Sequence, residues 1–153
     1  MYCVGKTRAG YLREAEAEYQ QRLSHYLPIT FETIPDIKGG GKLSSEQLKQ
    51  REGEAILRRS EAGDYLVLLD EGGKQFGSVD FAQWLDRRLQ HSSRRLVFVV
   101  GGAFGFAEAV YARANAKLSL SKMTFSHQMI RTFLSEQLYR AMTILRGENY
   151  HNV

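Results

Sequence analysis

The chain has 153 residues, 43% of them hydrophobic and 25% charged, so we expect one compact domain over residues 1–153 with its own core. A single cysteine, Cys3, excludes an internal disulfide framework and favours a cytoplasmic location. A net charge of +4 is compatible with RNA binding but does not establish it.

The sequence shows no feature of a membrane or metal protein. No apolar run is long enough to cross a bilayer, and no secretory signal follows Met1. The histidines lack metal-ligand spacing, so we expect no metal: His25, His91, His127 and His151.

The first part of the chain predicts a strand, a helix and a second strand. Residues 2–6 read as the end of a strand that turns at Gly5. Residues 29–34 alternate between apolar and polar, as a half-buried strand does. Between them, side chains at helical spacing predict a helix that stops at Pro28: Tyr11, Ala15, Tyr19, Leu23 and Tyr26.

A loop and a second helix are expected next. Residues 36–42 contain three consecutive glycines and predict a mobile loop. Ser44 and Gln47 form a capping-box pattern that opens a helix running through Ile56. Gly63 is expected to close that helix.

Two continuous apolar runs indicate strands that are buried on both faces. Residues 65–69 and 96–100 form these runs, and their starts lie about thirty residues apart, the length of a βαβ unit. The intervening helix is expected to begin at Ser78 and to bury Phe81, Leu85 and Leu89. Residues 70–74 read as a turn.

The last third predicts a glycine turn and two helices. After the turn at residues 101–105 we expect a helix from Phe106 to about Ala116. A long helix from about His127 to Arg146 should end at Gly147 and bury apolar side chains at helical spacing: Ile130, Phe133, Leu134, Leu138, Ala141, Met142 and Leu145. The predicted fold is therefore α/β, with a parallel sheet covered by helices on both faces and a ligand at the carboxyl ends of its strands.

Three segments carry candidate chemistry, each with a plainer alternative. Gly101-Gly102-x-x-Gly105 would let a ligand touch the main chain, although it lacks the dinucleotide spacing and could equally be a tight turn. Asp70 or Glu71 could contact a ribose or a cation, but a solvated turn acid is the commoner case. Residues 118–125 read either as a surface strand, which the pattern slightly favours, or as a loop that binds a flat adenine.

The final helix and tail form a fourth candidate. His127, Arg131, Ser135 and Tyr139 recur every four residues and share one face, which is usually a solvated basic face. An exposed Tyr150-His151 tail adds little to folding but can stack on or protonate a base.

Together these motifs resemble the RlmH family of bacterial SPOUT-class methyltransferases. The similarity covers essentially the whole chain. Four linked stretches carry it, in the family's order: Val99-Val100-Gly101-Gly102, Leu118 to Phe125 with His127-Gln128, Glu136 to Ala141, and Arg146-Gly147-Glu148 with Tyr150-His151. Departures from the family pattern are Ser126, where proline is usual, and the Asn152-Val153 tail.

The resemblance implies a fold and an activity that composition and spacing do not give. It implies a C-terminal trefoil knot, a rare threaded topology, and a homodimer with its active site at the subunit boundary. It implies N3 methylation of a pseudouridine of 23S ribosomal RNA on the assembled ribosome. The implied cofactor is S-adenosylmethionine, bound by Leu69, Gly101 and residues 120–125, namely Leu120, Ser121, Lys122, Met123, Thr124 and Phe125.

We further expect the last helix and tail to carry the catalytic side chains. Arg131 or Arg140 would stabilise the imide anion, and His151 or His127 would take the N3 proton. Tyr150 would stack on or hydrogen-bond the flipped base. Two alternatives remain: a SPOUT enzyme acting on transfer RNA, and a non-enzymatic RNA-binding or ribosome-associated module.

Overall fold

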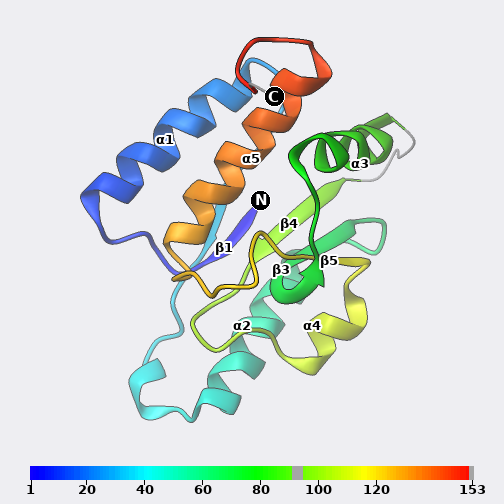
Figure 1. The fold of residues 1–153 in the computed structure, drawn as a ribbon. Coiled ribbons are helices and arrows are strands. Elements are labelled where there is room, and N and C mark those ends of the chain that lie inside the picture. The colour runs from blue at the N-terminus through cyan, green and yellow to red at the C-terminus, as the bar shows by residue number, and fades with distance from the viewer. Residues whose placement is uncertain (91–94, 152–153) are drawn as a thin grey trace.

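The computed structural model describes residues 1–90 and 95–151 (Figure 1). Five strands in this part of the chain form one sheet in the order β2-β1-β4-β3-β5, and every neighbouring pair is parallel. The strands are β1 (Tyr2–Val4), β2 (Glu32–Ile34), β3 (Tyr65–Lys74), β4 (Leu96–Val100) and β5 (Ala116–Leu118). The helices are α1 (Gly10–Ser24), α2 (Ser45–Arg59), α3 (Ser78–Gln90), α4 (Glu108–Arg113) and α5 (Met129–Leu145), with a 3₁₀ turn, η1, at Gly40–Lys42.

Helices cover both faces of the sheet, as the sequence predicts (Figure 1). Helices α1, α3 and α5 pack on one face, where Val67 and Phe98 belong to their apolar cluster. Helices α2 and α4 pack on the other, against Leu66, Val97 and Val99. Successive residues of β3 and β4 therefore enter different clusters, which explains why both strands are apolar throughout.

Strand β3 continues through the segment that was expected to be a turn. Lys74 pairs with Leu118 of β5, and the backbone N–H of Ser119 donates to the Lys74 carbonyl oxygen at 3.0 Å. A Cβ on Gly73 would lie 2.6 Å from backbone atoms of Leu118. Leu69 and Lys74 both pair with Leu118, so residues 70–73 bulge out of the ladder as an irregular turn, and only Lys74 returns to β5, which approaches closely where Gly73 has no side chain.

Several other boundaries follow pairing and packing more than local sequence signals. The second strand is confined to β2, Glu32–Ile34, and the loop predicted at residues 36–42 contains η1. Helix α2 keeps the predicted capping box between Ser44 and Gln47 but ends at Arg59, four residues before Gly63. The helix predicted to reach Ala116 stops at Arg113, because Ala116–Leu118 joins the sheet beside β3.

Most of the helix side chains that were predicted to be buried are buried or partly buried, but a few at the margins of the apolar faces are exposed. Along α5, Leu134, Leu138, Ala141 and Met142 are buried, whereas Phe133 is 39% exposed. Tyr11 of α1 and Leu89 of α3 are also exposed. Among the described residues, no helix combines the length and apolar character that a membrane crossing requires.

Candidate functional site

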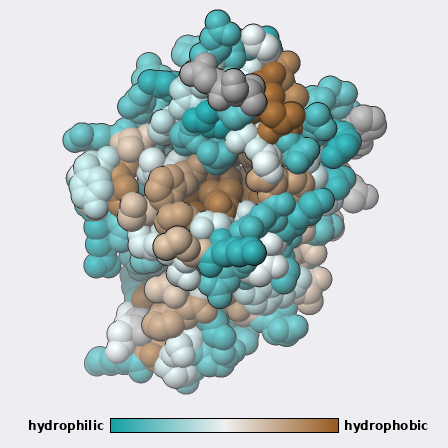
Figure 2. Space-filling view, viewed as in Figure 1, coloured by the Kyte–Doolittle hydropathy of each residue, from teal (hydrophilic) through white to brown (hydrophobic). Residues whose placement is uncertain are grey.

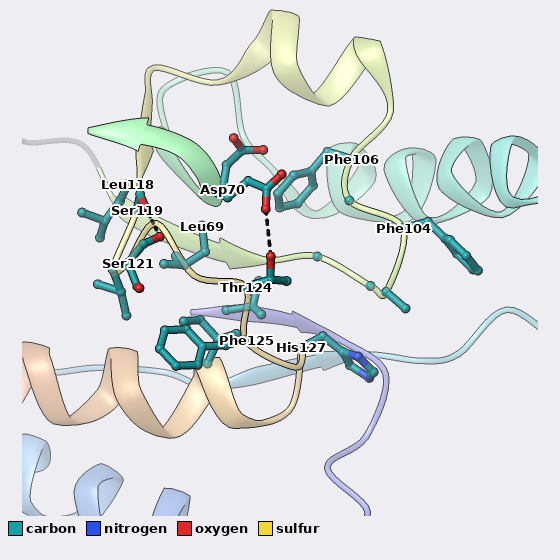
Figure 3. Close-up of a pocket in the computed structure, with 18 of the residues that line it drawn as sticks. Leu69, Asp70, Phe104, Phe106, Leu118, Ser119, Ser121, Thr124, Phe125 and His127 are labelled. Carbon is teal, nitrogen blue, oxygen red and sulfur yellow. Dashed lines mark hydrogen bonds between the residues drawn. The ribbon is translucent and has the colours of Figure 1, made fainter. Parts of the chain in front are cut away.

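A cavity of about 440 Å³ lies at the carboxyl ends of β3, β4 and β5, the expected edge of the sheet. Three chain segments line it, and the start of α5 closes one side (Figure 3). The lining residues of the three segments fall within 69–71, 100–106 and 118–125. Tyr111, His127 and Ile130 complete the lining. Its walls thus come from parts of the chain that only the fold brings together.

The glycine turn after β4 presents bare main chain to this cavity. A Cβ on Gly101 would lie 3.0 Å from the Phe106 ring, and one on Gly102 would lie 2.5 Å from a carboxylate oxygen of Glu52. Gly105 has φ of 79°, a conformation that side chains rarely adopt. The glycines are therefore required by close packing behind the turn and by its backbone geometry, and the same glycines leave the cavity side open.

The loop between β5 and α5 forms the second wall. Ser119 donates through Oγ to the Ser121 carbonyl oxygen at 2.8 Å, and the Met123 N–H donates to the Ser121 hydroxyl at 2.9 Å. Thr124 donates to a Glu71 carboxylate oxygen at 3.1 Å, which ties the loop to β3 (Figure 3). The strand interpretation of residues 118–125 was wrong beyond Leu118, where the chain forms a loop; the binding of an adenine by this loop stays a prediction.

The structure brings together nearly all the residues expected to bind the cofactor. Lys122 is the exception, since it is exposed and does not line the cavity. The others all line it: Leu69, Gly101, Leu120, Ser121, Met123, Thr124 and Phe125.

The acids after Leu69 are partly committed to protein contacts. Asp70 accepts a hydrogen bond from the Tyr111 hydroxyl at 2.6 Å and another from the Gly72 N–H at 2.9 Å. Burial, together with the hydrogen bond to Asp70, raises the pKa of Tyr111 to about 12. Asp70 is therefore more than a solvated turn acid: it fixes Tyr111 at the cavity wall.

His127 is the only predicted catalytic residue, among those described, that lines the cavity. Burial, and then the nearby Arg131 guanidinium, lower the pKa of its imidazole. The ring is therefore held in its neutral form, which can accept a proton.

Arg131 does not belong to a solvated basic face, so that interpretation was wrong for this residue. Its side chain is 2% exposed. It donates to the carbonyl oxygens of Val4, Gly5 and His127 and to the Thr7 hydroxyl, with N–O distances of 2.9 Å to Gly5 and 3.0 Å to both His127 and Thr7. Arg131 therefore joins the end of β1 to the start of α5, directly beneath His127.

The remaining predicted residues form a separate network at the far end of α5. Arg140 contacts a Glu136 carboxylate oxygen at 2.6 Å and the His151 Nδ1 at 3.3 Å. Tyr150 donates to the same Glu136 oxygen at 3.1 Å, and its ring lies under the Arg140 guanidinium at 4.7 Å. Burial and hydrogen bonds with Tyr19 and Glu136 raise the pKa of Tyr150.

This network is well separated from the cavity in one protomer. A helix rises about 1.5 Å per residue, so Arg140 lies roughly 17 Å along α5 from Met129. Arg140, Tyr150 and His151 do not line the cavity. Sequence reasoning missed Glu136, although its position four residues before Arg140 is the spacing of an ion pair on a helix. Asn152 and Val153 lie outside the described residues.

Within residues 1–90 and 95–151, no group of three His, Cys, Asp or Glu side chains is placed to hold a metal ion. His91, one of the four histidines considered above, lies outside these ranges.

The sheet and the cavity at its carboxyl edge define an α/β protein with a cavity beside open main chain, at the edge where such folds commonly bind ligands. A family model described as "Predicted SPOUT methyltransferase" matches residues 1–151. The chain belongs to the SPOUT methyltransferase family.

Relatives named "Ribosomal RNA large subunit methyltransferase H" match almost the whole chain. The one from Parabacteroides distasonis is 58% identical over 149 residues, covering 97% of this chain and 95% of the relative. The one from Christiangramia forsetii is 50% identical over 152 residues, covering 99% and 97%. A crystal structure of Archaeoglobus fulgidus Nep1 bound to S-adenosylhomocysteine matches with a TM-score of 0.38 and 13% identity, over 56% of this chain and 36% of that one. That last similarity is too slight to define the fold or the ligand of this chain.

Proposed function

We propose that this chain is an S-adenosylmethionine-dependent methyltransferase that methylates N3 of a pseudouridine in 23S ribosomal RNA of the assembled ribosome. The observation that carries the proposal is the convergence of Leu69, Gly101 and the 120–125 loop on one cavity, in a member of the SPOUT family. The name shared by relatives 58% and 50% identical to this chain supports the RNA substrate.

The residues around the cavity suit this cofactor. Leu69, Leu118, Leu120 and Ile130 supply an apolar wall for a flat base. The glycine turn and the loop after β5 supply main-chain donors and acceptors for its polar edges. The volume, about 440 Å³, is in the usual range for sites of small molecules.

The proposed chemistry depends on positioning and on one proton transfer. Bound S-adenosylmethionine supplies an electrophilic methyl group to an in-line nucleophile. N3 of the base must lose its proton before or during attack, and in this proposal the neutral His127 imidazole, which lines the cavity, accepts it. His151 is the alternative acceptor, with Arg140 beside it to stabilise the imide anion and Tyr150 to hold the flipped base.

We infer that the active site is completed by a second copy of the chain. Supporting this, the Arg140–Tyr150–His151 network is remote from the cavity of its own protomer. Apolar side chains also gather around the first turns of α5 near the centre of the face seen in Figure 2, where Phe125, Met129 and Phe133 are exposed. Gel filtration with light scattering tests this inference, and a stable, active monomer would contradict it.

We also propose that the C-terminal part of the chain is tied in a trefoil knot. Strand β5 lies beyond β3, on the far side from β4, and the loop after β5 returns past the glycine turn to reach α5 on the opposite face from α4. Tracing the backbone from residue 100 to residue 130 in a crystal structure tests this proposal. A backbone in which no segment passes through a loop formed by another would refute it.

Mass spectrometry of ribosomal RNA tests the function directly. Deleting the gene should remove one methyl group from a pseudouridine of 23S RNA, and complementation with the full chain should restore it. Purified protein should also transfer labelled methyl groups to ribosomes from the deletion strain. A loss of methylation in transfer RNA alone would point to a different SPOUT substrate, and absence of any methyl transfer would point to a binding module.

A further inference from the structure

A buried carboxylate lies directly behind the cavity wall. Glu52 of α2 is 8% exposed. Its two carboxylate oxygens lie 2.5 Å and 2.8 Å from the point that a Cβ on Gly102 would occupy. Gly102 itself lines the cavity, so the carboxylate approaches the site at a point where the wall has no side chain.

This carboxylate lacks the partners that a buried acid normally has. Within the described residues, Glu52 makes no hydrogen bond or ion pair, and its neighbour Gly53 packs against apolar Ala107, which precedes α4, and Val110 of α4. The charged group that acts on it from another element is Asp36, which has the same sign. Burial and, secondarily, Asp36 raise the pKa of Glu52. Largely buried acids are rare unless they are paired, so a cation from outside the chain would be attracted to this unpaired carboxylate.

We propose that Glu52 recognises the positive charge of the methyl donor, and thereby makes the cavity bind S-adenosylmethionine in preference to S-adenosylhomocysteine. The inference rests on the proposed function and adds a residue to its site. The sulfonium of the donor is positive, whereas the thioether left after methyl transfer is neutral. The Glu52 carboxylate, in contact with Gly102 of the cavity wall and largely buried, therefore attracts the donor and not the product through that sulfur. The missing Cβ of Gly102 lets the Glu52 carboxylate approach the back of the cavity wall, which brings its charge near a bound ligand.

Titration calorimetry of the full-length protein with each of the two compounds tests the proposal. Glu52→Gln keeps the shape of the side chain and removes its charge. We expect this variant to weaken S-adenosylmethionine binding by about tenfold and to change S-adenosylhomocysteine binding much less, so that the ratio of the two dissociation constants falls. Glu54→Gln, an exposed site on the same helix, is the matched control and should leave the ratio unchanged.

The pattern of losses separates an electrostatic role from a structural one. Equal weakening of both compounds, or no change in either, would overturn the proposal for Glu52 while leaving the proposed function intact. Failure of the unaltered protein to bind either compound would overturn both.

A measurement on the unaltered protein covers the case in which Glu52→Gln does not fold. Burial raises the pKa of Glu52, so as the pH is lowered from about 8 towards the ordinary glutamate value the carboxyl takes up its proton early and the preference for the charged compound should decline. Asp36→Asn removes the neighbouring like charge and should move that decline to lower pH. A preference that stays constant across this range would also refute the proposal.

Discussion

Arg131 Nη1 lies 2.9 Å from the Gly5 carbonyl oxygen, joining residues that are 126 positions apart in the sequence. The same guanidinium reaches the Val4 and His127 carbonyl oxygens, so one buried side chain holds the end of β1 against the start of α5. His127, which lines the cavity, is positioned by the backbone that Arg131 binds.

Arg131→Ala should therefore destabilise the protein as well as reduce activity. Removing the guanidinium leaves buried carbonyl oxygens without donors, and we expect a loss of about 3–5 kcal/mol in the free energy of unfolding. Urea denaturation measures this loss, and Arg13→Ala, an exposed arginine of α1, should change stability by less than about 0.5 kcal/mol. Unchanged stability with abolished methyl transfer would instead assign Arg131 a direct role on the substrate.

Gly73→Ala should weaken the pairing of β3 with β5. The new methyl group would lie 2.6 Å from the backbone of Leu118, which must move to admit it. We expect a loss of about 2–4 kcal/mol in unfolding free energy, together with weaker S-adenosylmethionine binding, because Leu118 also lines the cavity. Gly63→Ala is the matched control, since a Cβ there meets nothing within 4 Å. If Gly73→Ala and Gly63→Ala have equal free energies of unfolding, the close approach of β5 to Gly73 does not contribute to stability and the prediction is wrong.

The pH profile of methyl transfer should have an acid limb below the ordinary range of histidine. The pKa of His127 is lowered, so its imidazole stays neutral and able to accept a proton until the pH falls through that lowered value. Rates of methyl incorporation into ribosomes, measured across pH, locate the limb. His127→Asn should remove it and lower the rate by about 10²–10⁴-fold. If the limb persists in this variant, His151 or another group is the acceptor.

Two inactive variants should restore activity when they are mixed. His151→Ala removes the tail imidazole and should leave S-adenosylmethionine binding intact, because His151 does not line the cavity. Gly102→Leu should distort the cavity wall and abolish cofactor binding, since any side chain there meets Glu52. If sites are shared between protomers, refolding an equal mixture should recover about one quarter of the unaltered activity. No recovery, with exchange of protomers verified, would place each complete site within one chain.

The fold class follows from local sequence signals. Residues 65–69 and 96–100 are apolar throughout because both of their faces are covered, and that run length is recognisable without a structure. The capping box at Ser44 and Gln47 and the glycine turn after β4 are likewise set by neighbours in the sequence, and both are present. The segments proposed to bind the cofactor were named from the family resemblance, because the matching motifs are runs of a few consecutive residues.

Tertiary structure decided what depends on partners distant in the chain. The extension of β3 to Lys74 needs β5, and the burial of Arg131 needs carbonyl oxygens from the end of β1. Helical periodicity places His127 and Arg131 on one face, but it does not say whether that face meets water or the first strand. Hydrogen bonding and burial are properties of the folded neighbourhood, so side-chain type and spacing identified the candidates, while the packing of α5 against β1 decided which of them face the cavity.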